Sequence, residues 1–242
     1  MLKSIVKKLF NFSTALDRKS LADNYITGTG IEIGALHAPL PVNKKKATVR
    51  YVDRMTEKEL RQHYPELDKL PLVHVDYVAD GELLDTIPDN TQDFVIANHF
   101  IEHCQDTVLT LKNMLRVLKP GGIIFLAVPD KRFTFDKPRS VTSLEHILTD
   151  HEKGAIVSRE THFKEWATTF YSNEKEELVN QQAQKLMEQN YSIHFHVWEK
   201  TGMDELLVHL SKTMQLGFEI ELGLRKTGSV ENIYILRKLG TS

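Results

Sequence analysis

Carboxylates follow short apolar runs in this 242-residue chain, and their spacing indicates what they bind. Glu32 lies in residues 30–34, GIEIG, where a predicted buried strand ends at a glycine that permits a sharp turn or the close approach of a ligand. Such a strand end is where an open α/β sheet binds nucleotide-like ligands. Because the charge of Glu32 opposes a pyrophosphate, the motif favours a cationic ligand.

Two further acids follow predicted strands, and the first of them has a spacing suited to the ribose of a nucleoside. Asp53 ends a second predicted strand, 48–53, and follows the glycine by about 20 residues, which is the spacing of a carboxylate that accepts hydrogen bonds from ribose hydroxyls. The alternative role is that of a strand-end or helix-capping aspartate. Asp80 and Gly81 follow a third predicted strand, 72–78, and an Asp-Gly pair favours a turn for local reasons.

Histidines supply groups that titrate near neutral pH. Residues 99–103, HFIEH, follow a fourth predicted strand and match the zinc-peptidase pattern, but the predicted helix begins only at Asp106, which argues against that function. Five of the eleven histidines lie within residues 130–200. His194 and His196 point to one side of an extended segment, where structural, substrate and metal-binding roles stay open; we expect no metal. The candidate catalytic residues are His99, His103, Asp130, His146, His194 and His196.

Short strands that alternate with helices position these residues, which is typical of an α/β protein. The helix that begins at Asp106 carries apolar residues at helical spacing and ends before Pro120-Gly121-Gly122. Near the C-terminus, a capping box at Thr201 predicts the start of another helix. The predicted strands 218–224 and 232–236 must pair antiparallel, because a parallel return needs a crossover.

The block with Glu102-His103 before its helix and Leu118-Lys119-Pro120-Gly121-Gly122 after it resembles the class I S-adenosylmethionine (SAM)-dependent methyltransferases of the bacterial small-molecule type. The acid-x-Gly motif at Glu32 is similar to their first motif, although Leu36 stands where a second glycine is usual. The resemblance extends over nearly the whole chain and implies SAM as the cofactor. By this resemblance, its contacts are Glu32, Gly34, Ala35, Asp53, Arg54, Asp80, Gly81, Asn98 and His99.

The resemblance also implies the fold, a doubly wound, mostly parallel seven-stranded sheet (Rossmann-like) with an antiparallel last strand. We expect a single methyltransferase domain over residues 1–242. Two predicted helices within residues 1–27 would form an N-terminal helical cover. Residues 130–200 do not continue the alternation of strands and helices, so we expect a substrate-cap insertion after the fifth strand.

Composition excludes several other classes of protein. The chain is 41% hydrophobic with a formal net charge of -2, which is ordinary for a globular protein and unlike a basic nucleic-acid-binding domain. No apolar run approaches the roughly 18 residues of a membrane span. The single cysteine, Cys104, and the lack of a signal peptide predict a cytoplasmic protein. The patterns leave the oligomeric state unknown.

The predicted reaction is transfer of the SAM methyl group to a small polar acceptor by in-line displacement, with a hydroxyl favoured over an amine. By analogy with the resemblance, a saccharide or natural-product intermediate is a candidate acceptor. One alternative is a catalytically silent SAM-binding or scaffold domain, suggested by Leu36. The other is a nicotinamide-dependent oxidoreductase, which is disfavoured because Gly-x-Gly-x-x-Gly is absent and Glu32 is badly placed for pyrophosphate.

Overall fold

The computed structural model describes residues 17–225 and 228–240, and its centre is a seven-stranded sheet with the order β3-β2-β1-β4-β5-β7-β6. β7 pairs antiparallel with both β5 and β6, and the other pairings are parallel. The fold is therefore the doubly wound, mostly parallel sheet that the sequence predicts. The strands are β1 (Gly28–Ile33), β2 (Ala47–Asp53), β3 (Tyr77–Val78), β4 (Gln92–Asn98), β5 (Leu118–Pro129), β6 (Phe218–Leu224) and β7 (Glu231–Lys238).

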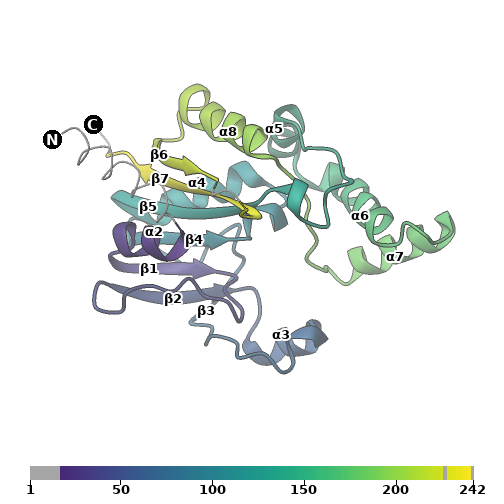
Figure 1. Ribbon diagram of the computed structural model, residues 1–242, viewed down its shortest axis with the longest axis horizontal. Coiled ribbons are helices and arrows are strands. Elements are labelled where there is room, and N and C mark those ends of the chain that lie inside the picture. The colour runs from purple at the N-terminus through teal and green to yellow at the C-terminus, as the bar shows by residue number, and fades with distance from the viewer. Residues whose placement is uncertain (1–16, 226–227, 241–242) are drawn as a thin grey trace.

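Helices cover both faces of the sheet, and α6 and α7 lie beyond the ends toward which β1, β2 and β4 point (Figure 1). None of the helices in the described residues is both long and apolar enough to span a membrane. The helices are α2 (Arg18–Tyr25), α3 (Glu57–His63), α4 (Thr107–Val117), α5 (Leu144–Lys153), α6 (Ile156–Phe170), α7 (Glu176–Glu188) and α8 (Lys200–Val208). Short helical turns are η1 (Pro65–Leu67), η2 (Ile101–His103), η3 (Lys131–Phe133) and the π-helical η4 (His209–Thr213).

Alternate residues of each central strand pack into two separate cores. Ile33 and Ala97 belong to the core that α4 and α8 complete, whereas Ile96 and Phe125 belong to the core beneath α2. Because successive side chains of a strand point to opposite faces, one apolar run fills both layers. The Asp17 side chain caps α2 by accepting from Ser20 N at 2.8 Å. Of the predicted N-terminal helical cover, residues 1–16 lie outside the described residues.

The segment between β5 and α8, which we call the inserted segment, leaves the sheet and returns beside its starting point. Asp130 and Trp198 form an isolated β-bridge, and Lys131 N donates to Trp198 O at 3.0 Å. The helices α5, α6 and α7 lie between these two ends. The role of this segment as a substrate cap stays a prediction.

Two predicted elements are wrong in their extent. The third strand contains only Tyr77–Val78, because the preceding amides bond elsewhere: Val73 N donates to Leu36 O and Val75 N donates to Glu57 Oε1.

The helix α8 begins after Glu199, and neither Glu199 nor Thr201 supplies the predicted cap. Asp204 instead pairs with Lys200 Nζ at 2.7 Å and accepts a hydrogen bond from Tyr234 Oη at 2.7 Å. Its carboxylate is therefore engaged one turn inside the helix.

Candidate functional site

A cavity of about 540 Å³ opens at the carboxyl ends of β1, β2 and β4, and we call it the strand-end cavity. The sheet supplies one side of it, and residues at the end of the inserted segment supply the other. The lining residues that the sequence predicts as functional are Gly34, Asp53, Arg54, Asp80, Gly81, His99 and His103.

Two glycines, Gly34 and Gly81, line the side of the strand-end cavity that the sheet forms, where a side chain would occupy space. Gly34 turns the chain out of β1 with φ of 64°, and its amide donates to Val52 O at 2.9 Å. A Cβ atom at Gly81 would lie 2.6 Å from Phe100 Cζ and 2.7 Å from Ile33 Cγ2, so only glycine fits there without displacing its neighbours. The carboxylate of Asp53 borders this side of the cavity, and burial raises its pKa to about 6.

Two residues on the cavity wall are not glycines yet have the left-handed backbone conformation that favours glycine. Leu36 has φ of 50° and His99 has φ of 49°. Such conformations cost non-glycine residues roughly 1–2 kcal/mol and concentrate at ligand sites. Leu36, where the resemblance leads one to expect a glycine, thus keeps the turn that a glycine would make.

Glu32 lies behind the cavity and does not line it. Its Oε1 atom accepts hydrogen bonds from Leu40 N at 2.8 Å and from Asn98 Nδ2 at 3.5 Å. Its Oε2 atom is buried and has no hydrogen-bond partner among the described residues. Burial raises the pKa of Glu32 to about 7. Glu32 therefore anchors the loop that follows β1, and Ala35 and Asn98 likewise do not line the strand-end cavity.

His99 faces the strand-end cavity and is held by a carboxylate from β7. Its Nε2 atom lies 2.8 Å from Glu231 Oε2, and 39% of the side chain is exposed. Arg18 also binds Glu231, with its Nε donating to Oε1 at 2.7 Å. Burial acts to raise the pKa of Glu231, but the hydrogen bonds from His99 and Arg18 outweigh it and lower the pKa to about 2. Glu231 is therefore ionised beside His99.

His103 lines the cavity at its border with the inserted segment. Its Nδ1 atom lies 2.9 Å from Ile193 O and 3.0 Å from Ser192 Oγ. Burial, and then the nearby His194, lower the pKa of His103 to about 3, so the ring is neutral at pH 7. Glu102 is fully buried beside it, and burial raises its pKa to about 8. Glu102, His103 and His194 each offer one ligand-type atom, and these atoms lie within 4.8 Å of one another.

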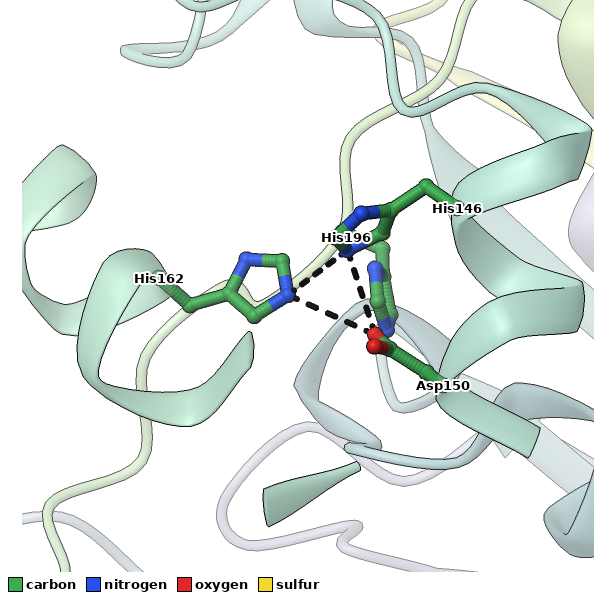
Figure 2. A group of neighbouring side chains, drawn as sticks. All are labelled: His146, Asp150, His162 and His196. Carbon is green, nitrogen blue, oxygen red and sulfur yellow. Dashed lines mark hydrogen bonds and ion pairs between the residues drawn. The ribbon is translucent and has the colours of Figure 1, made fainter. Parts of the chain in front are cut away.

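Four predicted catalytic residues do not line the strand-end cavity. Asp130 is buried and pairs with Arg132, whose Nη2 donates to Oδ2 at 2.6 Å. His194 Nδ1 lies 2.6 Å from Asp136 Oδ2. His146, which is half-buried, and His196 belong to a group with the buried Asp150 and His162, shown in Figure 2. We call these four residues the histidine–aspartate group.

The structure separates His194 from His196, although the sequence predicts that both point to one side of their segment. His194 contacts His103 and Asp136, whereas the ring of His196 lies 5.0 Å from that of His162. The segment is irregular rather than a strand, so alternation does not hold. Within the histidine–aspartate group, burial lowers the pKa of both His162 and His196.

The sequence did not predict several residues that line the strand-end cavity, among them Asn190 and Tyr64. Both contact the predicted residue Arg54: its Nη1 donates to Asn190 O at 2.9 Å, and its Nη2 donates to the hydroxyl of Tyr64. This contact joins the end of β2 to the end of the inserted segment, 136 positions later in the chain. The unpredicted polar lining residues are Tyr64, Glu66, Glu82, Gln105, Asn190, Tyr191 and Ser192.

Residues 27–126 match a family model described as a methyltransferase domain. No curated protein matches the chain. Among solved structures, a SAM-dependent methyltransferase from Aquifex aeolicus is 12% identical with a TM-score of 0.49, over 95% of this chain and 97% of that one. A SAM-dependent methyltransferase from Methanosarcina mazei is 18% identical with a TM-score of 0.47, over 90% of this chain and 96% of that one. The CurJ carbon methyltransferase is 12% identical with a TM-score of 0.47; the match covers 89% of this chain, which spans about half of that protein.

Proposed function

We propose that this chain, whose residues 27–126 match a methyltransferase-domain model, is a SAM-dependent methyltransferase and that it methylates a hydroxyl group of a small polar acceptor. The observation that carries the proposal is the strand-end cavity, which is lined by the acids Asp53 and Asp80 and by the histidines His99 and His103. A cavity lined by both acids and histidines suits an adenosyl cofactor beside a hydroxyl acceptor.

The residues present fit SAM. We propose that Asp53 accepts hydrogen bonds from the ribose, and that Asp80 accepts from the adenine amino group. Gly34 and Gly81 leave room for the cofactor, since a side chain at Gly81 would clash with the cavity wall. Arg54 and His99 would border the cofactor directly, whereas Glu32, Ala35 and Asn98 would act by shaping the loop and strand ends behind it.

SAM supplies a methyl group on a sulfonium, whose departure needs no protonation. The protein must therefore orient the acceptor, exclude water and receive a proton from the hydroxyl. We propose His99 as the base, because its ring lines the cavity and Glu231 accepts a hydrogen bond from Nε2, which leaves Nδ1 to receive the proton. His103 is neutral and hydrogen-bonded at Nδ1, so its other nitrogen is suited to accept a hydrogen bond from the acceptor. Asp130 is already paired with Arg132 and fits a structural role.

Calorimetric titration with SAM, S-adenosylhomocysteine and NAD tests the cofactor. We expect heat with both adenosyl compounds and none with NAD, and the absence of heat with either adenosyl compound would contradict the proposal. A panel of small hydroxyl and amine compounds, assayed by release of S-adenosylhomocysteine, then tests the acceptor. Cofactor binding without turnover on any acceptor would favour the silent domain. The cytoplasm remains the compartment that we propose, on the single cysteine.

Substitution His99→Gln tests the base. We expect kcat on a hydroxyl acceptor to fall roughly 100-fold or more, because the proton then has no receiving group. His37→Gln, at an exposed position away from the cavity, is the control. Glu231→Gln should also lower kcat, because it removes the carboxylate that orients the ring of His99 through Nε2. An unchanged kcat in either variant would contradict these roles.

A further inference from the structure

The histidine–aspartate group collects side chains from three separate parts of the inserted segment. His146 and Asp150 lie one turn apart on α5, His162 projects from α6, and His196 comes from the segment after α7 (Figure 2). Residues at i and i+4 of a helix share a face, so α5 presents its two groups together. One ligand-type atom from each of the four side chains lies within 4.8 Å of the other three.

The distances within the group match those between the ligands of a tetrahedral metal. His146 Nε2 lies 3.0 Å from His162 Nε2 and 3.1 Å from Asp150 Oδ2, and His162 Nε2 lies 3.6 Å from Asp150 Oδ2. Zinc bonds of about 2.0–2.1 Å to nitrogen and oxygen place tetrahedral ligand atoms roughly 3.3 Å apart. Three edges of a tetrahedron are therefore already set to within a few tenths of an ångström.

Hydrogen bonds alone leave this group incomplete. Asp150 is 2% exposed; its Oδ2 atom has only the contacts with His146 and His162, and its Oδ1 atom has no hydrogen-bond partner among the described residues. His196 is fully buried; a proton on its Nε2 donates to Gln105 O at 3.3 Å, which leaves Nδ1 as a free lone pair with no partner. Orienting a histidine through its other nitrogen is typical of metal ligands. Burying unpartnered polar atoms is costly, and a cation would offset that cost.

We propose that His146, Asp150, His162 and His196 bind one Zn²⁺ ion. This departs from the expectation of no metal. Three imidazoles and one carboxylate suit zinc, whereas Mg²⁺ and Ca²⁺ prefer all-oxygen ligands. Four protein ligands close the coordination sphere, which is the arrangement of a structural site.

The ion would fix α5, α6 and the segment around His196 to one another. That segment also forms the wall of the strand-end cavity, since Phe195 lines it and Phe195 N donates to Glu102 O at 2.8 Å. Gln105, which accepts from His196, lines the cavity as well. Zinc would therefore hold the side of the cavity that faces the acceptor, without touching the acceptor itself.

The test uses tag-free, full-length protein that has been stripped with a chelator and titrated with ZnCl₂. We expect one zinc per chain, and a rise in melting temperature of about 5–10 °C at free zinc near 100 times Kd. Co²⁺ should give the visible absorption of a tetrahedral site. Less than half an equivalent of zinc bound, or no rise in melting temperature, would overturn the proposal.

Variants locate the site. Asp150→Asn and His162→Gln should each weaken zinc binding by at least about 100-fold and abolish the rise in melting temperature. His209→Gln, on η4, is the matched control and should bind as the parent does. His103→Gln tests the other group of ligand-type atoms and should also leave zinc binding unchanged. Equal affinity in Asp150→Asn and the parent, or loss of binding in His103→Gln alone, would overturn the assignment even where a variant is less stable.

Discussion

The ion-pair network around Arg139, which we call the base of the inserted segment, and the wall of the strand-end cavity both contain buried ionisable groups. In the network these groups are paired, whereas Glu102 at the cavity wall lacks hydrogen-bond partners among the described residues. Arg139 is 4% exposed; its Nη1 donates to Asp136 Oδ1 at 2.9 Å and its Nη2 donates to Glu165 Oε2 at 3.1 Å. Asp136 also binds His194. Behind the cavity wall, beside His103, Glu102 is 1% exposed; neither of its carboxylate oxygens has a hydrogen-bond partner among the described residues, and Oε1 lies 3.9 Å from His99 Nδ1.

This difference separates two uses of buried charge. Removing one partner of a buried ion pair leaves an uncompensated charge and is strongly destabilising, so the segments that the network at Arg139 joins depend on one another. An unpaired carboxylate stays protonated at a cost that grows with pH, and it persists where something other than folding requires it. The cavity wall adds the left-handed backbone of Leu36 and His99, a second cost in the same place. Both costs mark the strand-end cavity as the functional region.

The largest effect should follow from breaking the paired network. Arg139→Met leaves Asp136 buried without its cation, and it frees the carbonyl oxygens of His194 and Phe195, to which Arg139 also donates. We expect the free energy of unfolding to fall by roughly 3–5 kcal/mol. Urea unfolding followed by circular dichroism measures this loss. Lys164→Met, at an exposed position of α6, should change stability little. A loss below about 1 kcal/mol in Arg139→Met would erase the contrast between the two regions.

Substitution of the unpaired carboxyl group of Glu102 should stabilise the protein, in contrast to substitution of Arg139. Burial raises the pKa of Glu102 from its ordinary value to about 8, so the folded protein holds a proton that the unfolded chain releases near 4.5. Stability contributed by this group is therefore lost as pH rises from 4.5 to 8. Glu102→Gln removes that loss, and its stability relative to the parent should increase by roughly 2–4 kcal/mol between pH 5 and pH 8.

Denaturant unfolding of the ligand-free protein across this pH range measures the slope. Glu145→Gln, at an exposed position of α5, supplies a control that should show no such slope. If the stability of Glu102→Gln relative to the parent stays constant or falls as pH rises, the Glu102 carboxylate is ionised in the folded state and its charge is compensated there. The cavity wall would then be built like the base of the inserted segment.

The sequence predicts the cavity better than the inserted segment, for a physical reason. Strands that end in a glycine or an acid are local patterns, and parallel strands bring their ends to one edge, so Gly34, Asp53 and His99 meet as expected. The sequence did not predict the left-handed turn at Leu36, because leucine rarely adopts this backbone conformation.

Contacts within the inserted segment depend instead on how helices pack. His146 and Asp150 share a helix that was not predicted, and their partners His162 and His196 arrive from two other segments. The sequence shows that histidines are concentrated in this segment, but it does not show which of them contact one another. For the same reason the contact of Arg54 with Asn190, across 136 positions, has no local signal.

The smallest expected effect concerns Asp53, and it tests whether the buried acid at the cavity binds the cofactor. Burial raises its pKa to about 6, with backbone hydrogen bonds from Arg54 and Met55 opposing that rise. An ionised carboxylate accepts hydrogen bonds from hydroxyls more strongly than a neutral one. If Asp53 holds the ribose, SAM affinity should fall as pH decreases through 6, approaching tenfold for each unit below it. Binding near pH 6 should then release a proton, because the bound cofactor favours the charged form.

Calorimetry at pH 5, 6 and 7.5, in two buffers of different ionisation enthalpy, measures both the affinity and the proton released. Asp53→Asn should weaken binding at pH 7.5 by roughly 1–3 kcal/mol and flatten the pH dependence. Asp85→Ala, an exposed acid away from the cavity, should retain both the affinity and the slope. Equal slopes in Asp53→Asn and the parent would remove Asp53 from the ribose site. Its raised pKa would then reflect burial alone, and the acids of the cavity wall would have no ligand to offset their cost.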